Sequence, residues 1–130
     1  MEPKFLSLAE VVEIHSDQIR RYGGSPDILD LAMLQSAVAA PRAAFSGELL
    51  HHDIYAMAAA YLFHVVRNHP FVDGNKRTGT VAALVFLAMN GVRFEAEGRA
   101  LETLVLSVAR GDAAEDEVAG FLRAHSRSRT

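Results

Sequence analysis

The chain reads His69-Pro70-Phe71-Val72-Asp73-Gly74-Asn75-Lys76-Arg77-Thr78-Gly79 between two strongly apolar segments. Pro70 cannot continue the helix that the preceding apolar residues predict, because it lacks a backbone N–H and its ring clashes with the previous turn. The uninterrupted apolar run from Val81 to Met89 predicts a buried helix on the other side. The quoted residues therefore form a loop between two helices of the core.

The second half of this loop has the features of an anion site. Asn75 is a favourable N-cap residue, and Gly74 can adopt the left-handed backbone angles of an anion-binding nest. Lys76 and Arg77 fall in the first turn of the helix, where the macrodipole makes each cation unfavourable by about 0.3–1 kcal/mol. A phosphate would offset that effect, because phosphates bind at helix N-termini. We therefore predict that phosphate groups bind where this helix begins.

The polar side chains of the loop suit phosphoryl chemistry. His69 is the residue type that takes up and releases a proton near neutral pH. Asp73 supplies the kind of carboxylate that Mg²⁺ uses together with substrate phosphates. Arg77 can hold phosphate oxygens through two parallel hydrogen bonds. Phe71, an apolar residue among polar neighbours, is expected to point into the core and anchor the loop.

These residues resemble the signature of the Fic/Doc family: His-Pro-Phe, two residues often ending in Asp or Glu, then Gly-Asn-Gly-Arg or, in the death-on-curing (Doc) branch, Asn-Lys-Arg. The likeness to the Doc branch includes Phe5-Leu6-Ser7-Leu8, Ile19 to Gly24, Asp30 with Leu31, Ala37 to Pro41 and Asn90-Gly91. It implies a toxin that uses ATP and Mg²⁺ with four catalytic residues. By this resemblance His69 is the general base, Asp73 is the magnesium ligand, and the phosphate cradle consists of Gly74, Asn75, Lys76 and Arg77.

Lys76 distinguishes two activities within the family. The adenylylating Fic enzymes have a second glycine at this place, which lets the phosphates of the nucleotide lie against the backbone. A lysine side chain fills that path, so the resemblance implies that ATP binds in the reverse direction and presents its γ-phosphate to the acceptor. The Doc toxins are kinases of this type and act on a threonine of elongation factor Tu. Protein adenylylation, the transfer of AMP, is the alternative.

Two residues depart from the family patterns. Gly74 stands where the founding Doc toxin has Ala, and Thr80 stands where the longer Fic signature has a second Arg. The missing Arg removes a phosphate contact used in adenylyl transfer, which favours the kinase. No Glu in the chain has Ser or Thr four residues before it, so the inhibitory helix of some Fic proteins is not expected. The resemblance therefore implies a separate inhibitor, a Phd-like antitoxin whose partly disordered tail folds into a groove on the toxin.

The composition predicts one globular domain. A chain of 130 residues with 50% hydrophobic content can bury roughly two-thirds of its unfolded surface. It has no cysteine and no apolar signal region after Met1, which indicates a cytoplasmic protein. The net charge of −3 argues against direct nucleic-acid binding, and no apolar run approaches the ~18 residues of a membrane span. We assign residues 1–125 to the domain and residues 126–130 to a flexible C-terminal tail.

Helical periodicity predicts an all-α fold of about six helices around a central buried pair. Ser7, with Glu10 in capping-box spacing, is expected to start the first helix, and Asp30 and Asp53 the second and third. The fourth helix should run from Lys76 to Asn90. Two more are indicated by the apolar positions Leu101, Leu104, Val105, Val108, Val118, Phe121 and Leu122.

Three alternatives stay open. Residues 45–52 include Leu49 and Leu50, which lie outside any helical stripe. This segment is either a flap that docks the target as an added strand, as in Fic relatives, or a loop whose two leucines pack into the core. The run His51-His52-Asp53 is found either in metal phosphohydrolases of the HD type or as loop histidines before an N-cap. A catalytically inactive binding module would carry the same loop.

The remaining histidines are expected to have structural roles. His15 continues an apolar stripe and His64 has apolar neighbours on both sides, so both are interpreted as hydrogen-bonded residues at the edge of the core. His125, near the C-terminus, is expected to be exposed.

Overall fold

The computed structural model describes residues 2–128. This part of the chain forms six α-helices, a short 3-10 helix and two small two-stranded sheets, which confirms the all-α prediction in its main features. Every helix within residues 2–128 is too short or too polar to cross a bilayer. The helices are α1 (Leu8–Tyr22), α2 (Leu31–Ala39), the 3-10 helix Ala40–Arg42, α3 (Ile54–Asn68), α4 (Asn75–Met89), α5 (Gly98–Arg110) and α6 (Glu115–Ala124), and the strands are β1 (Ala44–Phe45), β2 (Glu48–Leu49), β3 (Val92–Phe94) and β4 (Ser126–Ser128).

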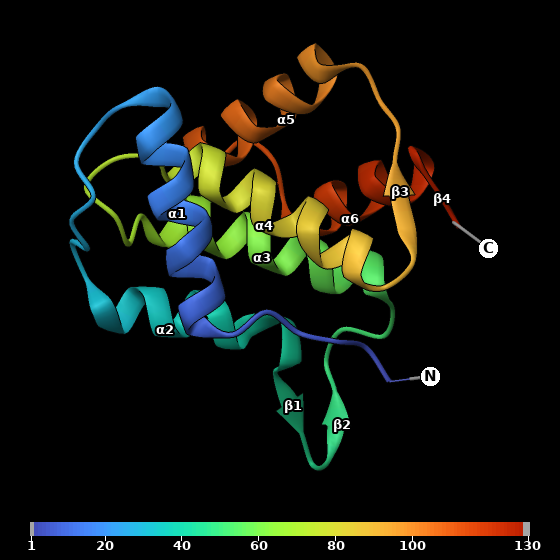
Figure 1. Ribbon diagram of the computed structural model, residues 1–130. Coiled ribbons are helices and arrows are strands. Elements are labelled where there is room, and N and C mark those ends of the chain that lie inside the picture. The colour runs from blue at the N-terminus through green and yellow to red at the C-terminus, as the bar shows by residue number, and fades with distance from the viewer. Residues whose placement is uncertain (1, 129–130) are drawn as a thin grey trace.

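Helices α3 and α4 are the predicted central pair, and the other four α-helices pack around them (Figure 1). The apolar residues of both helices fill the core of the domain. Gly79 permits their close approach, because a Cβ atom at this position would lie 3.1 Å from the backbone oxygen of Leu62. The buried residues at the centre of the pair are Ala58, Ala59, Tyr61, Leu62, Ala82, Ala83, Phe86 and Leu87. The loop between α3 and α4 therefore starts and ends on rigid elements.

The helix starts predicted from capping residues are confirmed. Ser7 and Glu10 form a capping box at α1, in which each side chain bonds the backbone N–H of the other residue, at 3.1 and 2.8 Å. Asp30 and Asp53 each accept a hydrogen bond from the N–H three residues later, at 3.0 and 2.8 Å. Helix α1 ends at Gly23, whose φ of 87° suits glycine.

Residues 126–128, the first part of the predicted C-terminal tail, lie in a small sheet. These residues form β4, which pairs antiparallel with β3. The side chain of Arg127 also contacts Glu95 at 2.8 Å. A three-residue strand of Ser, Arg and Ser has no alternating apolar pattern, so its sequence gave no sign of this pairing. Residues 129 and 130 of the predicted tail lie outside the described residues.

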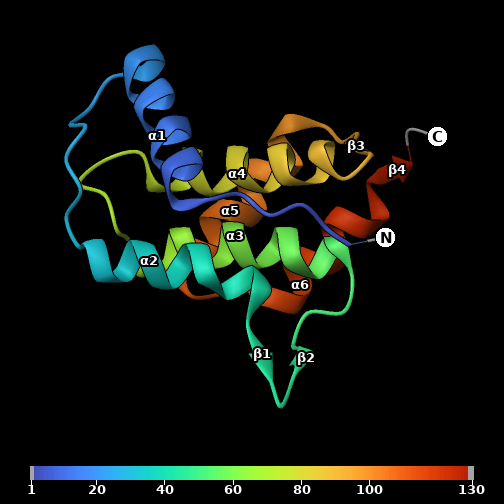
Figure 2. The same cartoon turned by 60° about the horizontal axis from the view of Figure 1, so that its bottom comes forward.

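The segment 45–52 overlaps a hairpin of β1 and β2, residues 44–49, that projects from the helices (Figure 2). Phe45 is 75% exposed and Leu50 is 58% exposed, while Leu49 is 37% exposed. The alternative in which the leucines are tucked into the core is therefore wrong. The shape is that of a flap, and its role in docking a target stays a prediction.

Candidate active site

The loop begins at His69, the C-cap of α3, whose backbone lies in the left-handed region (φ 49°, ψ 54°). Histidine is one of the few non-glycine residues enriched there. The left-handed angles end α3 and turn the chain, and the side chain of His69 is exposed. The predicted general base is therefore presented at the surface by the end of a buried helix.

The backbone of the loop is fixed from two sides. The oxygen of Pro70 accepts hydrogen bonds from the N–H groups of Leu29 and Asp30, at 2.8 and 3.1 Å. Phe71 has no exposed surface, which confirms the prediction that it points into the core. The segment before α2 and the core thus hold the residues that follow His69 in one conformation.

Asn75 is the first residue of α4 and not its N-cap, so that prediction is wrong. Its buried side chain pairs with the backbone of Phe71: Nδ2 donates to the oxygen at 2.9 Å, and Oδ1 accepts from the N–H at 3.0 Å. A buried backbone group needs a hydrogen-bond partner. The requirement of the Phe71 backbone therefore outweighs the preference of Asn for the N-cap position.

Gly74 is the N-cap of α4 and has the left-handed angles of an anion-binding nest (φ 85°, ψ 14°). No side chain caps this helix, and no acidic residue lies in its first turn. Its first N–H groups have no acceptor inside the helix, and they lie at the positive end of the helix dipole. Among the described residues, Lys76 and Arg77 form no ion pair with a carboxylate. The residues present therefore fit a phosphate group.

Asp73 is exposed and is oriented by residues outside the loop. The N–H of Ser25 donates to Asp73 Oδ2 at 2.7 Å, and His15 Nε2 lies 2.8 Å from the backbone oxygen of Asp73. A Cβ atom at Gly24 would lie only 2.9 Å from Asp73 Cβ, so glycine permits this approach. The second carboxylate oxygen receives no hydrogen bond from the described residues, which fits a Mg²⁺ ion that takes few protein ligands.

The supports at His15, Gly24 and Ser25 were not predicted as parts of the site. His15 was expected to be a hydrogen-bonded residue at the edge of the core, which is confirmed. Gly24 was noted only as the last residue of the stretch Ile19 to Gly24, which resembles the Doc branch. These residues lie far from the loop in the sequence, and no spacing pattern connects them with it.

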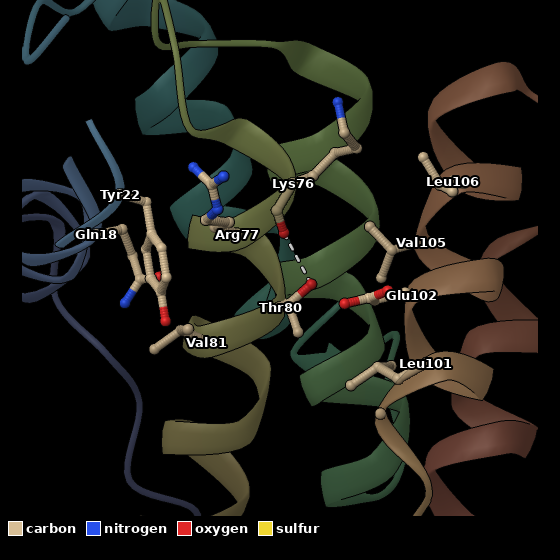
Figure 3. A pocket seen from close by; sticks show the side chains of 11 residues that line it. Gln18, Tyr22, Lys76, Arg77, Thr80, Val81, Leu101, Glu102, Val105 and Leu106 are labelled. Carbon is tan, nitrogen blue, oxygen red and sulfur yellow. Dashed lines mark hydrogen bonds between the residues drawn. The ribbon is translucent and has the colours of Figure 1, made fainter. Parts of the chain in front are cut away.

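A pocket of about 520 Å³ lies beside this site, between α1, α4 and α5 (Figure 3). Lys76 and Arg77 line it, whereas His69 and Asp73 do not. The guanidinium carbon of Arg77 lies 4.7 Å from the centre of the Tyr22 ring, a cation–π contact that holds Arg77 toward α1. The other lining residues are Gln18, Thr80, Val81, Gly98, Leu101, Glu102, Val105 and Leu106. The pocket thus joins the cationic start of α4 to a mainly apolar wall on α5, which also carries Glu102.

Two residues of the run His51-His52-Asp53 make structural contacts, His51 and Asp53. Asp53 caps α3 and contacts Arg123 at 2.7 Å. Burial alone would raise the pKa of Asp53, but the N–H of Ala56 and the Arg123 guanidinium outweigh it and hold the pKa below the ordinary value of 3.8. No group of three or more His, Cys, Asp or Glu side chains within residues 2–128 is arranged to hold a metal.

Two histidines, His51 and His64, contact the carboxylate of Glu115 at the start of α6. His64 Nε2 lies 3.0 Å from Glu115 Oε1, and His51 Nε2 lies 3.5 Å from Glu115 Oε2. The hydrogen bond from His64 lowers the pKa of Glu115 below its ordinary value of 4.5, against the opposing effect of partial burial, and the charges of both histidines add to the lowering. His125, expected to be exposed, is half-buried and donates from Nδ1 to the oxygen of Phe121 at 2.9 Å.

Comparison with known proteins gives consistent matches. A family model described as the Fic/DOC family matches residues 5–87. The chain is 32% identical over 120 residues to a protein of Escherichia phage P1 named "Protein kinase doc", and the match covers 92% of this chain and 94% of that protein. It is 41% identical over 104 residues to "Toxin Doc" of Mycolicibacterium smegmatis, covering 78% of this chain and 79% of that protein.

Proposed function

Since this chain belongs to the Fic/DOC family, we propose that it is the toxin of a toxin–antitoxin pair and a kinase that phosphorylates a threonine of elongation factor Tu. The observation that carries this proposal is the start of α4, where the left-handed Gly74 and an uncapped helix end adjoin Lys76 and Arg77, which form no ion pair with a carboxylate of residues 2–128. The names of the two relatives, a protein kinase and a toxin, support both parts of the proposal.

The phosphates of ATP bind at the start of α4. The backbone N–H groups after Gly74 donate to phosphate oxygens, while Lys76 and Arg77 balance the negative charge. Asp73 would hold Mg²⁺ together with the phosphates, and the chemistry that the ion would supply there is neutralisation of charge on the transferred group. The hydrogen bond from Ser25 keeps the Asp73 carboxylate in place for this role.

His69 acts as the general base. It takes the proton of the acceptor hydroxyl while the oxygen of that hydroxyl attacks the γ-phosphorus. The bond from this phosphorus to the oxygen that bridges the β- and γ-phosphates breaks, and ADP leaves. The left-handed backbone at position 69 suits this role, because it places the imidazole outside the helix that carries it.

Lys76 supports phosphoryl transfer over adenylyl transfer. The side chain of Lys76 is exposed at the start of α4 and takes the place of the glycine that adenylylating relatives have. Its side chain occupies the path that the nucleotide phosphates take in those relatives, and its ammonium group attracts the phosphates of an ATP that binds in the reverse direction. The γ-phosphate is therefore the group that faces His69.

Incubation of a bacterial lysate with the protein and ATP labelled at either the α- or the γ-phosphate tests the assignment. Label on a protein from γ-labelled ATP alone is the expected result. Label from α-labelled ATP alone would mean adenylylation, because AMP transfer leaves the α-phosphate on the target and releases the γ-phosphate in pyrophosphate. No label on any protein from either nucleotide would favour the binding module. A Lys76→Gly variant should lose label from γ-labelled ATP.

The pocket between α1, α4 and α5 is the groove that we assign to the antitoxin. Its apolar wall suits one face of an amphipathic helix, and Lys76 with Arg77 suits an acidic residue on that helix. Leu106 lies on this wall and is 47% exposed. An occupant here would cover the two cations and so block the phosphate site.

A matched pair of variants on α5 tests this assignment. Leu106→Asp should abolish protection of growing cells by a co-expressed Phd-like antitoxin, because it puts an unpaired charge into the interface. Thr103→Asp, on the same helix but outside the pocket lining, should leave protection intact. Equal protection of both variants would rule out the pocket as the antitoxin site.

A further inference from the structure

His15 is a buried ionisable residue on α1 that contacts the loop at two points. It is 1% exposed. Its ring stacks on Phe71 with 3.6 Å between ring centres and 5° between ring planes. Its Nε2 lies 2.8 Å from the backbone oxygen of Asp73. Because a carbonyl oxygen can only accept, Nε2 carries the hydrogen of this bond.

The hydrogen bond determines which way one peptide group faces. The C=O of Asp73 and the N–H of Gly74 belong to the same trans peptide, and they point in opposite directions. With the oxygen held toward His15, the N–H of Gly74 points away from His15. If this peptide flipped, a carbonyl oxygen would replace the N–H on that side and would repel an anion.

The ring of His15 also limits the space for such a flip. A Cβ atom at Gly74 would lie 3.4 Å from His15 Cδ2 and 3.5 Å from Nε2, so the ring is close to the backbone of the nest. The stacked Phe71 is held in turn by both hydrogen bonds of Asn75. The imidazole of His15 is therefore packed between the ring of Phe71 and the backbone of Gly74 at the start of α4.

We propose that His15 is a positioning residue for phosphoryl transfer, which sets the polarity of the anion nest by holding the Asp73–Gly74 peptide with its N–H toward the phosphates. The inference rests on the proposed function, because it assumes a phosphate ligand at Gly74. His15 acts through the backbone and touches neither nucleotide nor acceptor.

Two substitutions separate the contacts of His15. His15→Phe keeps an aromatic ring on Phe71 but removes the donor to Asp73. His15→Gln keeps an N–H at a similar depth but removes the ring. Val11→Ala is the matched control, because Val11 is a fully buried residue one turn earlier on α1. It weakens the packing of α1 and changes no hydrogen bond or ring contact of the loop.

The measurement is the dissociation constant of Mg·ATP by calorimetry, at a temperature where all four proteins are folded, together with the NMR shift of the Gly74 amide without ligand. His15→Phe should weaken Mg·ATP binding by about tenfold or more, the equivalent of one hydrogen bond to a charged group, and should shift the Gly74 amide. His15→Gln should remain within about threefold of the wild type, and Val11→Ala should bind as the wild type does.

The outcomes separate this inference from the kinase assignment. Wild-type binding of Mg·ATP by His15→Phe, or equal weakening in His15→Phe and Val11→Ala, would refute the positioning role. A wild-type protein that binds Mg·ATP but labels no target would refute the kinase assignment. In that case, weaker Mg·ATP binding by His15→Phe than by His15→Gln would still establish the positioning role of His15. A wild-type protein that does not bind Mg·ATP would refute both.

Discussion

At the scale of single residues, the loop between α3 and α4 departs from local preferences at three places. His69 has left-handed backbone angles, Lys76 and Arg77 lie at the unfavourable end of the helix dipole, and α4 has no side-chain cap. Departures of this kind concentrate at functional sites. Each can be tested by a single substitution, because the neighbouring contacts are defined.

Replacement of His69 by Asn should separate chemistry from folding. Asn also tolerates left-handed angles, and the side chain at this position is exposed, so the free energy of unfolding should change by no more than about 0.5 kcal/mol. The rate of transfer should fall by about 10²–10⁴, the usual contribution of a general base. Initial rates and urea unfolding of both proteins measure the two effects. A variant with the wild-type rate would exclude His69 as the base.

Asn75 should prove to be a stabilising residue as well as part of the cradle. Asn75→Ala leaves the buried N–H and C=O of Phe71 without partners and should lower the free energy of unfolding by about 2–4 kcal/mol. Lys76→Ala, at the next and exposed position, should change it by less than about 0.5 kcal/mol. Urea unfolding compares them, and equal stability of Asn75→Ala and the wild type would show that these hydrogen bonds contribute nothing.

The burial of Phe71 could be predicted from the sequence, but the hydrogen-bond partners of Asn75 and the residues that support the loop could not. Phe71 was predicted as the anchor because an apolar residue among polar neighbours must find the core. Asn75 was misassigned because capping preference is local, whereas its real partner, the Phe71 backbone, becomes visible only when the loop is folded. His15 and Ser25 could not be predicted as supports, because contacts between distant segments leave no periodicity in the sequence.

At the scale of secondary-structure elements, the fold depends on how closely α3 and α4 approach each other. The helix bounds were largely predictable, since Ser7, Asp30 and Asp53 are strong capping residues next to apolar stripes. The sheet of β3 and β4 was not predicted, because short strands of polar residues are stabilised by pairing with a distant partner and not by their own pattern.

Two glycines in helices should respond in opposite ways to alanine. Gly79→Ala puts a Cβ atom 3.1 Å from both Leu62 O and Val66 Cγ2, so the protein should lose about 1–3 kcal/mol of stability as the helices move apart. Gly120→Ala on α6 meets nothing within 4 Å and should gain about 0.5–1 kcal/mol through higher helix propensity. Thermal or urea unfolding gives both values, and stabilisation by Gly79→Ala would contradict the tight α3–α4 contact.

The hairpin of β1 and β2 should affect recognition of the protein substrate and not of ATP. A double variant, Leu49→Ser with Leu50→Ser, removes exposed apolar surface from the hairpin and should raise the KM for the protein substrate. The KM for ATP should stay constant, since neither residue belongs to the loop or to the pocket between α1, α4 and α5. An unchanged KM for the protein substrate would exclude the hairpin as a docking flap.

At the scale of the whole molecule, Glu115 connects the start of α6 to α3 and to the segment before it, through His64 and His51. Since the pKa of Glu115 is lower in the folded protein than its ordinary value of 4.5, its contribution to stability is present above that value. The contribution is lost as the pH falls through the lowered pKa. Acid should therefore weaken the attachment of α6 to the central pair.

Unfolding of the wild type and Glu115→Gln at several pH values tests this link. The wild type should be the more stable protein at pH values above 4.5, and the difference should shrink as the pH falls below this value. A difference that stays constant across this range would mean that the ionisation of Glu115 does not contribute to stability.

The whole molecule is a helical scaffold that presents the cationic, uncapped start of α4 together with the exposed His69, despite its net charge of −3. Intact-mass spectrometry of purified elongation factor Tu, incubated with this protein, ATP and Mg²⁺, tests the kinase assignment most directly, with His69→Asn as the control. A mass gain of one phosphoryl group that is absent with His69→Asn is the predicted result. A gain of AMP, or an unchanged mass, would contradict phosphorylation of this target.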